Sequence, residues 1–243
     1  MEKALEALEP KKDGAGRISV RPKSTEDVVF CLQQASAAGC SVSVVGGNHS
    51  GYARTGDLIL EMTDFTSVAC ETDALTVGAG LSLKEIALEA YERNLAVPLG
   101  TAPTVGLGLV LQGGVGHLTR SLGLALDAVR AMQLVTLQGD VLNVSESSEP
   151  DLFWALRGCG PNFGVVTSVT LQGSPFRACD TRRLVFEDPS QLPKYLSWSS
   201  ALPPECSADC CLWLGPHFGS SLKWFKGFTG GTLATRRSCR SAS

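Results

Sequence analysis

The sequence predicts a protein of mixed helices and strands, and three observations carry this prediction. Short runs rich in valine, isoleucine and leucine, such as 42–45 and 58–62, have the composition of buried strands. The segments 24–39 and 83–93 repeat apolar residues at the spacing of one helix face. Glycine-rich turns connect these segments, and 44% of the 243 residues are hydrophobic, which is enough to bury a sizeable core.

The first elements in chain order are a strand, a helix and a second strand. Residues 17–21 form a short extended segment that ends at Pro22. Ser24 is of the residue type that caps helix N-termini, and the acidic residues after it lie where the helix dipole favours negative charge. Gly39 ends this helix, and the strand 42–45 follows.

Further strands and one clear helix follow the first glycine-rich turn. We expect strands at 58–62, 67–71 and 75–77, and then an amphipathic helix from Leu83 to Arg93.

A hairpin and a final strand close this part of the chain. The hairpin joins 129–137 to 141–144, Asp151 is expected to cap a short helix at 152–156, and the last strand is 165–171.

The composition changes after Pro175, where prolines become frequent and the apolar pattern weakens. We therefore place a domain boundary near Gly173. The chain becomes rich in small and basic residues from Gly219 onward, and we expect disorder there. The expected division is an N-terminal extension at 1–16, a main domain at 17–173, an incomplete second domain at 174–218 and a disordered tail at 219–243.

Charge and hydropathy argue against several classes of protein. The net charge of -3 disfavours nucleic-acid binding, which needs a basic surface. No apolar run reaches the roughly 18–20 residues that span a bilayer, and no secretory signal is visible, so we expect a cytoplasmic protein without membrane contact.

The nine cysteines are irregularly spaced, which does not support a disulfide framework. Cys206, Cys210 and Cys211 lie close together but lack a second pair of ligands at zinc spacing. We expect reduced thiols and no metal site.

One stretch, 43–51, combines a strand with a turn of two glycines and a histidine. Gly46 and Gly47 have no Cβ, so successive backbone N–H groups can converge on a phosphate. His49 is compatible with a base, a metal ligand, a covalent attachment point or an ordinary loop residue.

A second stretch, 98–123, holds many glycines and little charge. So many glycines indicate backbone packed close to a flat ligand or to other backbone. Both readings stay open, as does the choice between a structural and a cofactor-contacting role for His117.

Four blocks in a fixed order resemble the flavin domain of the vanillyl-alcohol-oxidase/p-cresol-methylhydroxylase superfamily, in its berberine-bridge-enzyme-like branch. They are Arg21 to Val28, Gly46 to Ala53, Pro103 to Asp127, and Asp151 to Thr167. The resemblance covers roughly 17–172 and implies an α+β, PCMH-type FAD-binding domain with two sheets and flanking helices. It also implies a substrate domain over the flavin, which this chain would carry only in truncated form.

The resemblance assigns roles to individual residues. His49 is the position bonded to the flavin 8α-methyl group, while relatives with a second link carry a cysteine at the position of Ala102. We therefore expect FAD attached through His49 only. Tyr52 is a candidate for flavin contact or for covering the loop. The full set of expected cofactor-binding residues is Gly46, Gly47, Asn48, His49, Ser50, Gly51, Tyr52, Thr104, Gly106, Gly113, Gly114, Gly116, His117, Val165 and Val166.

The implied reaction is transfer of a hydride from a small alcohol, sugar or amine to FAD, with dioxygen as the electron acceptor. The alternative is a non-catalytic flavin-binding remnant or a truncated gene product. No residue is identified as the catalytic base. A dinucleotide fold of the NAD type is disfavoured, because the pattern at Gly106 and Gly108 lacks its third glycine.

Overall fold

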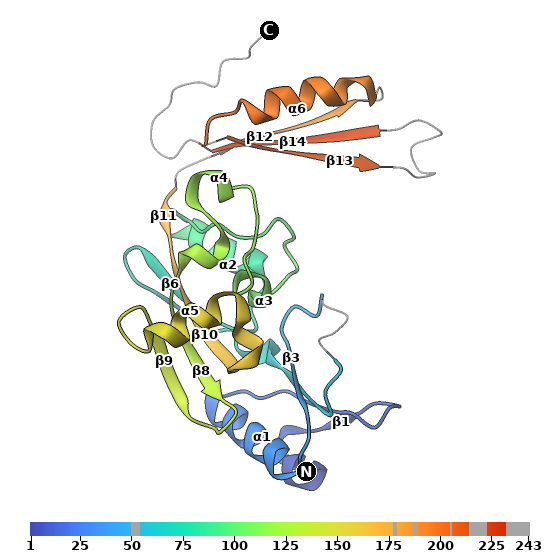
Figure 1. The fold of residues 1–243 in the computed structure, drawn as a ribbon, viewed down its shortest axis with the longest axis vertical. Helices are drawn as coiled ribbons and strands as arrows, with labels where there is room; N and C mark the ends of the chain where they lie inside the picture. The colour runs from blue at the N-terminus through green and yellow to red at the C-terminus, as the bar shows by residue number, and fades with distance from the viewer. Residues whose placement is uncertain (50–53, 177–178, 187–188, 205, 214–222, 232–243) are drawn as a thin grey trace.

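The computed structural model describes residues 1–49, 54–176, 179–186, 189–204, 206–213 and 223–231. Three sheets of three or more strands follow one another along the long axis of this described part, and the N-terminus lies at the end opposite the third sheet (Figure 1). The α+β class expected from the sequence is confirmed.

The first sheet is mixed, and helix α1 (Thr25–Ala37) packs on it. The Ser24 side chain accepts the Asp27 N–H and the Asp27 carboxylate accepts the Ser24 N–H, which confirms the predicted start of the helix. β2 and β3 both run parallel to β4, which lies between them. The strands in pairing order are β1 (Lys11–Lys12), β2 (Ile18–Val20), β4 (Leu58–Glu61) and β3 (Val42–Val45).

The second sheet is antiparallel, and its central strand comes last in the sequence. That strand, β10 (Gly164–Gln172), pairs with β6 on one side and with β8 on the other. β8 and β9 form the predicted hairpin. The other strands are β5 (Val68–Cys70), β6 (Ala74–Gly78), β8 (Val129–Thr136) and β9 (Val141–Ser145). Helices α2 (Leu83–Glu92) and α5 (Pro150–Cys159) belong to the same unit.

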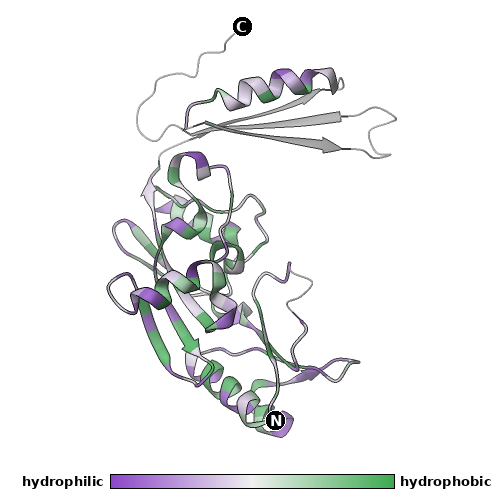
Figure 2. Ribbon diagram, viewed as in Figure 1, coloured by the Kyte–Doolittle hydropathy of each residue, from purple (hydrophilic) through white to green (hydrophobic). Residues whose placement is uncertain are grey.

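Two cores lie on opposite sides of the junction between these sheets. Val135 and Val165 belong to the core under α1, whereas Leu134 belongs to the core of the second sheet and Val166 packs against it. Neighbouring residues of a strand point to opposite faces, so β8 and β10 contribute to both cores. The hydropathy colouring shows apolar residues along these strands and along one stripe of α1 (Figure 2).

Short elements fill the connections. The glycine-rich stretch 98–123, for which no helix was predicted, contains the helices α3 (Leu107–Val110) and α4 (Thr119–Leu122). Within the described ranges, none of the helices has the length and hydropathy needed to cross a bilayer. The remaining short elements are η1 (Glu2–Leu8), η2 (Met62–Asp64), β7 (Leu95–Ala96), η3 (Ala125–Ala128), η4 (Gly160–Asn162) and β11 (Ser174–Pro175).

Asp151 is not the helix cap that the sequence suggested. α5 starts one residue earlier, at Pro150, and the residue before it, Glu149, has a left-handed backbone with φ of 58° and makes no side-chain cap. Proline is well suited to the first helical position because it has no N–H to satisfy there. Asp151 therefore lies inside the first turn.

The third sheet has the order β12 (Cys179–Phe186), β14 (Lys223–Gly231) and β13 (Cys206–Trp213). The residues 223–231 were predicted to belong to a disordered tail, but here they form the central strand. The reason lies in Trp224, Phe225 and Phe228, aromatic residues that favour strands. Residues 214–222 and 232–243 lie outside the described part.

Helix α6 (Leu192–Ser200), which follows η5 (Pro189–Gln191), covers the face of the third sheet that points away from α4 (Figure 1). Arg120 of α4 joins this unit to the rest of the chain. Its guanidinium donates to the Ser199 carbonyl over 3.3 Å and also to the Leu202 carbonyl. Carbonyls at a helix C-terminus lack partners within the helix and attract cations, so Arg120 is suited to hold the end of α6.

Replacing Arg120 with alanine should loosen the attachment of the third sheet. We expect faster amide hydrogen exchange at 192–213 in R120A, with the exchange of β6 and β10 unchanged, because those strands lie in a separate core. R120K keeps the charge but not the planar pair of donors, so its exchange rate at 192–213 should lie between those of R120A and the unaltered protein. Equal exchange at 192–213 in R120A and the unaltered protein would contradict this role.

Candidate functional site

The predicted phosphate-binding turn leaves the first sheet at the end of β3. Val45 is buried and pairs with Glu61 of β4, and the chain then turns through Gly46 and Gly47. Asn48 has a left-handed backbone with φ of 55°, a conformation that asparagine tolerates better than most residues. Residues 47–49 are exposed.

One side of this turn lies against the main chain of 104–106. A Cβ built on Gly47 would lie 2.5 Å from the Gly106 nitrogen and 3.0 Å from the Thr104 oxygen. A Cβ on Gly106 would lie 2.7 Å from the Gly47 nitrogen. The structure therefore brings the three predicted site residues Gly47, Thr104 and Gly106 together by contact of backbone with backbone, which the two glycines permit.

The N-terminus of α2 binds the segment 103–106 through two backbone hydrogen bonds. The Leu83 N–H donates to the Val105 carbonyl over 2.8 Å, and the Lys84 N–H donates to the Pro103 carbonyl over 2.9 Å. These are N–H groups that a helix start leaves without intrahelical partners. The site thus depends on the correct start of α2.

A capping box fixes that start. The Ser82 hydroxyl accepts the Glu85 N–H, and the Glu85 carboxylate accepts both the Ser82 N–H, at 2.8 Å, and the Ser82 hydroxyl, at 2.6 Å. The hydrogen bond from the Ser82 hydroxyl is the main reason that the pKa of the Glu85 carboxyl lies below its usual value. The carboxylate form of Glu85 is therefore favoured in the folded chain.

The second glycine cluster is anchored by main-chain contacts. The Gly113 and Gly114 carbonyls accept the N–H groups of Leu126 and Ala125 over 2.9 and 3.0 Å. A Cβ on Gly116 would collide with the Leu99 carbonyl oxygen, whereas a Cβ on Gly113 would meet open space. Gly116 is thus required by close backbone, whereas Gly113 is favoured by its backbone conformation, with φ of 129°.

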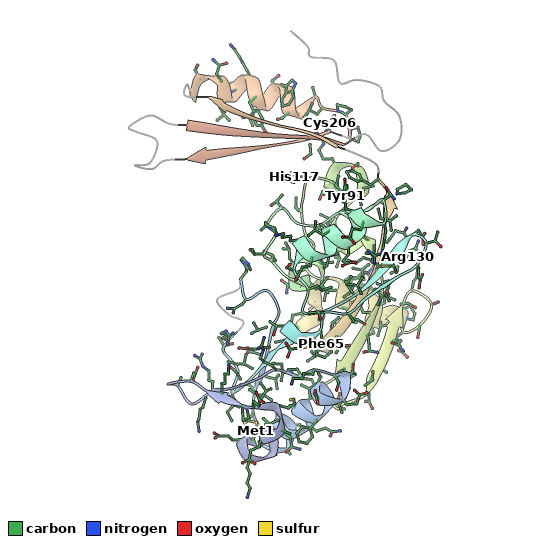
Figure 3. The ribbon with its side chains drawn as sticks, turned by 180° about the vertical axis from the view of Figure 1, so that it is seen from behind. Met1, Phe65, Tyr91, His117, Arg130 and Cys206 are labelled. Atoms are coloured by element: carbon green, nitrogen blue, oxygen red, sulfur yellow. The ribbon has the colours of Figure 1, made fainter. Side chains whose placement is uncertain are left out.

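His117 is half-buried and lies beside α4, on the side where the third sheet approaches (Figure 3). This position places it between the glycine-rich segment and the C-terminal unit. Its structural and cofactor-contacting roles remain alternatives.

Val165 and Val166 offer main chain rather than side chains. Val165 is buried and pairs with Val135 of β8, and Val166 is half-buried. On its other edge β10 begins to pair with β6 only at Ser168, so the start of β10 keeps one edge toward which a ligand can be directed.

The three predicted cofactor-binding stretches, around residues 47, 113 and 165, come from the first sheet, the glycine-rich loop and the second sheet. Backbone N–H groups in such an arrangement can bind a diphosphate without side-chain charge. Ser50, Gly51 and Tyr52 lie outside the described residues.

Several contributors were not predicted from the sequence. Arg54 donates to the Asn48 side chain and to Glu61, and Gln133 accepts hydrogen bonds from Thr25 and Thr167 between the two cores. Each joins residues distant in sequence or separated by a turn, so no local pattern marks them.

Cysteines at 31, 40, 70 and 159 are free thiols. Burial raises the pKa of the Cys31 thiol to about 12, so this group stays protonated at neutral pH. In the described ranges no three His, Cys, Asp or Glu side chains are grouped to hold a metal ion.

Comparison with known proteins places this site among flavoproteins. Residues 17–145 match a family described as FAD binding domain. (R)-6-hydroxynicotine oxidase of Paenarthrobacter nicotinovorans is 41% identical over 155 residues, which is 61% of this chain and 34% of that protein.

Solved structures are similar over nearly the whole chain. The crystal structure of 6-hydroxy-D-nicotine oxidase from Arthrobacter nicotinovorans matches with a TM-score of 0.81 and 28% identity, over 95% of this chain and 54% of that one. Glucooligosaccharide oxidase from Acremonium strictum, described with a 6-S-cysteinyl, 8α-N1-histidyl FAD, matches with a TM-score of 0.78 and 27% identity, over 93% and 54% of the two chains. The chain spans about a third of the length of the curated relatives it matches, 34% for the oxidase of Paenarthrobacter.

Replacing Gly47 with alanine should separate the turn from 104–106, because the new methyl group would overlap the Gly106 nitrogen. Overpacking of this kind costs about 1–3 kcal/mol, so the melting temperature of G47A should fall. Gly108 is the matched control, since its Cβ would meet open space in α3. G108A should melt at the same temperature or higher, and equal melting of both variants would contradict the proposed contact.

Removing the Ser82 hydroxyl should destabilise α2 in a pH-dependent way. S82A should lose about 1 kcal/mol of unfolding free energy at neutral pH, as for other lost N-caps. Because the folded pKa of Glu85 is lowered, the stabilisation is present above the unfolded pKa of glutamate and is lost as pH falls through the folded value. Denaturant unfolding should show that the difference in unfolding free energy between S82A and the unaltered protein becomes smaller from pH 7 to pH 3. A difference that stays constant over this range would contradict the prediction.

Proposed function

The chain belongs to the family of FAD binding domains that its residues 17–145 match, and from this membership we propose that it is the cofactor-holding part of an FAD-linked oxidoreductase. The relationship expected from the sequence is confirmed by the similarity to FAD-linked oxidoreductases in sequence and fold. We propose 17–173 as the FAD-binding domain and 174–218 as the start of a substrate-binding domain.

The contact between Gly47 and 104–106, next to the exposed His49, is the observation that carries this proposal. The main chain of Gly46, Gly47 and Asn48, with Ser50 and Gly51, would bind the diphosphate. The segment 113–117 would lie along the cofactor, and Val165 and Val166 would meet its adenine end. Thr104 and Gly106 would support the turn, and Tyr52 would lie near the flavin.

When bound, FAD supplies an acceptor for a hydride taken from a C–H bond next to oxygen or nitrogen. The work of this chain is to retain the cofactor and to exclude water from part of it. The names of the relatives include a hydroxynicotine oxidase and a glucooligosaccharide oxidase. We propose a small alcohol, sugar or amine as the substrate and dioxygen as the electron acceptor.

We further propose that His49 alone forms a covalent bond to the cofactor. An imidazole nitrogen is a suitable nucleophile, and the position at which relatives with a second link carry cysteine is Ala102, which has no sulfur. Attachment would prevent loss of the cofactor and make the flavin easier to reduce.

Acid precipitation tests the attachment. The purified protein should carry yellow flavin that stays with the precipitate, and a tryptic digest should give a flavin peptide that contains His49. H49A should release all of its flavin into the supernatant. A flavin peptide with Ala102 and without His49 would refute single attachment through His49.

Anaerobic reduction separates an oxidoreductase from a flavin-binding protein without turnover. Bleaching of the flavin absorbance by a small alcohol, sugar or amine, and its return on admission of air, would support the oxidase. A stable yellow protein that no such compound bleaches would favour the non-catalytic alternative.

A further inference from the structure

Arg54 lies where the chain returns from the predicted cofactor turn. Its Nε donates to the Asn48 Oδ1 over 3.2 Å, and its Nη2 contacts the Glu61 Oε1 over 2.8 Å. The two groups that it joins are a residue of the turn and the last residue of β4. The Arg54 guanidinium therefore connects the turn, at Asn48, to the end of β4, at Glu61.

Glu61 is a firm anchor for this bridge. It pairs in register with Val45, the last residue before the turn, and its side chain is 22% exposed. Its other oxygen, Oε2, lies 4.0 Å from the Nε of Arg21, which also contacts Asp64 and Thr63. The position of Glu61 is thus set by its pairing in the sheet, and Arg21 lies beyond hydrogen-bond distance of its carboxylate.

The main chain of Arg54 is held as well. Arg17 donates from its Nη1 to the Arg54 carbonyl. Since both its backbone and its side chain are fixed, Arg54 can in turn restrain what it binds. The Asn48 backbone is left-handed, with φ of 55°, and the hydrogen bond from Arg54 fixes the side chain of this residue.

We propose that Arg54 is a positioning residue that clamps Asn48 and thereby fixes the adjoining His49 for covalent attachment of the flavin. This inference rests on the proposed function for its ligand, but the clamp itself is a property of the chain. The new C–N bond would replace one C–H bond of the flavin 8α-methyl group and the N–H bond of the imidazole. Two protons would leave to solvent, and the two electrons would reduce the flavin, which the proposed acceptor dioxygen would reoxidise. Formation of such a bond is sensitive to small misplacements of the nucleophile. A loosened turn should therefore slow attachment more than it weakens reversible binding.

Arg21 offers a matched control. It belongs to the same cluster and contacts the same carboxylate, but its hydrogen bonds and ion pairs run to Thr63, Glu61 and Asp64 rather than to the turn. R21A and R54A change the net charge equally. Only R54A removes the contact with Asn48.

The test follows the appearance of acid-stable flavin after FAD is added to flavin-free protein. We expect R54A to attach flavin at least about tenfold more slowly than the unaltered protein, as misplacement of a reacting group predicts. Its reversible FAD binding, measured by quenching of flavin fluorescence, should be retained. R54K should recover part of the rate, and R21A should behave like the unaltered protein. Equal slowing in R21A and R54A would overturn the clamp in favour of a general charge effect.

Hydrogen exchange of the flavin-free protein gives a readout that needs no cofactor. The amides of 46–49 should exchange faster in R54A than in R21A or the unaltered protein. Equal exchange in all three would overturn the clamp whether or not flavin binds. If the unaltered protein never binds flavin, the proposed function fails, while the exchange data still decide the role of Arg54. Loss of reversible FAD binding with unchanged exchange would assign Arg54 to direct phosphate binding and also overturn positioning.

Discussion

The contact of main chain with main chain at Gly47 and Gly106 is the constraint on which the rest of the site depends. Nothing larger than hydrogen fits on either Cα, because a Cβ on one would reach the backbone nitrogen of the other. The contact joins the end of β3, in the first sheet, to the loop that α2 holds in the second unit. It therefore fixes the relative position of two units that have separate cores, and it does so beside an exposed histidine.

A second connection between the units runs through the interior. Gln133 of β8 accepts a hydrogen bond from Thr25 at the start of α1, at 2.9 Å, and one from Thr167 of β10, at 2.7 Å. Thr167 is almost fully buried, so its hydroxyl needs this partner. Hydrogen bonds are directional, so polar contacts of this kind fix the relative orientation of two apolar surfaces more strictly than apolar packing alone. Two contacts thus hold the two units together: the backbone contact of Gly47 with Gly106, and the hydrogen bonds of Gln133 with Thr25 and Thr167.

Elements with strong local signals were predictable, and contacts between distant segments were not. Ser24 and Asp27 mark the start of α1 within four residues, and buried and half-buried residues alternate along β10. The glycine turn was recognisable because the residues that form it, from Gly46 to His49, are consecutive in the sequence. The bridge from Arg54 to Asn48 and Glu61, and the docking of Arg120 on α6, depend on how the sheets assemble. β14 was not predicted for a related reason. Its glycines and threonines are typical of a disordered segment, and its strand pairing with β12 and β13 cannot be read from the local sequence.

The strand order of the second sheet has a consequence for biosynthesis. β10 is the central strand, yet it is synthesised after β5, β6, β8 and β9. Until residue 172 has emerged, β6 and β8 each lack a partner along one edge, and unpaired edges invite association with other chains. A ribosome that stalls between β9 and β10 would leave a nascent chain in this vulnerable state, in need of chaperone protection.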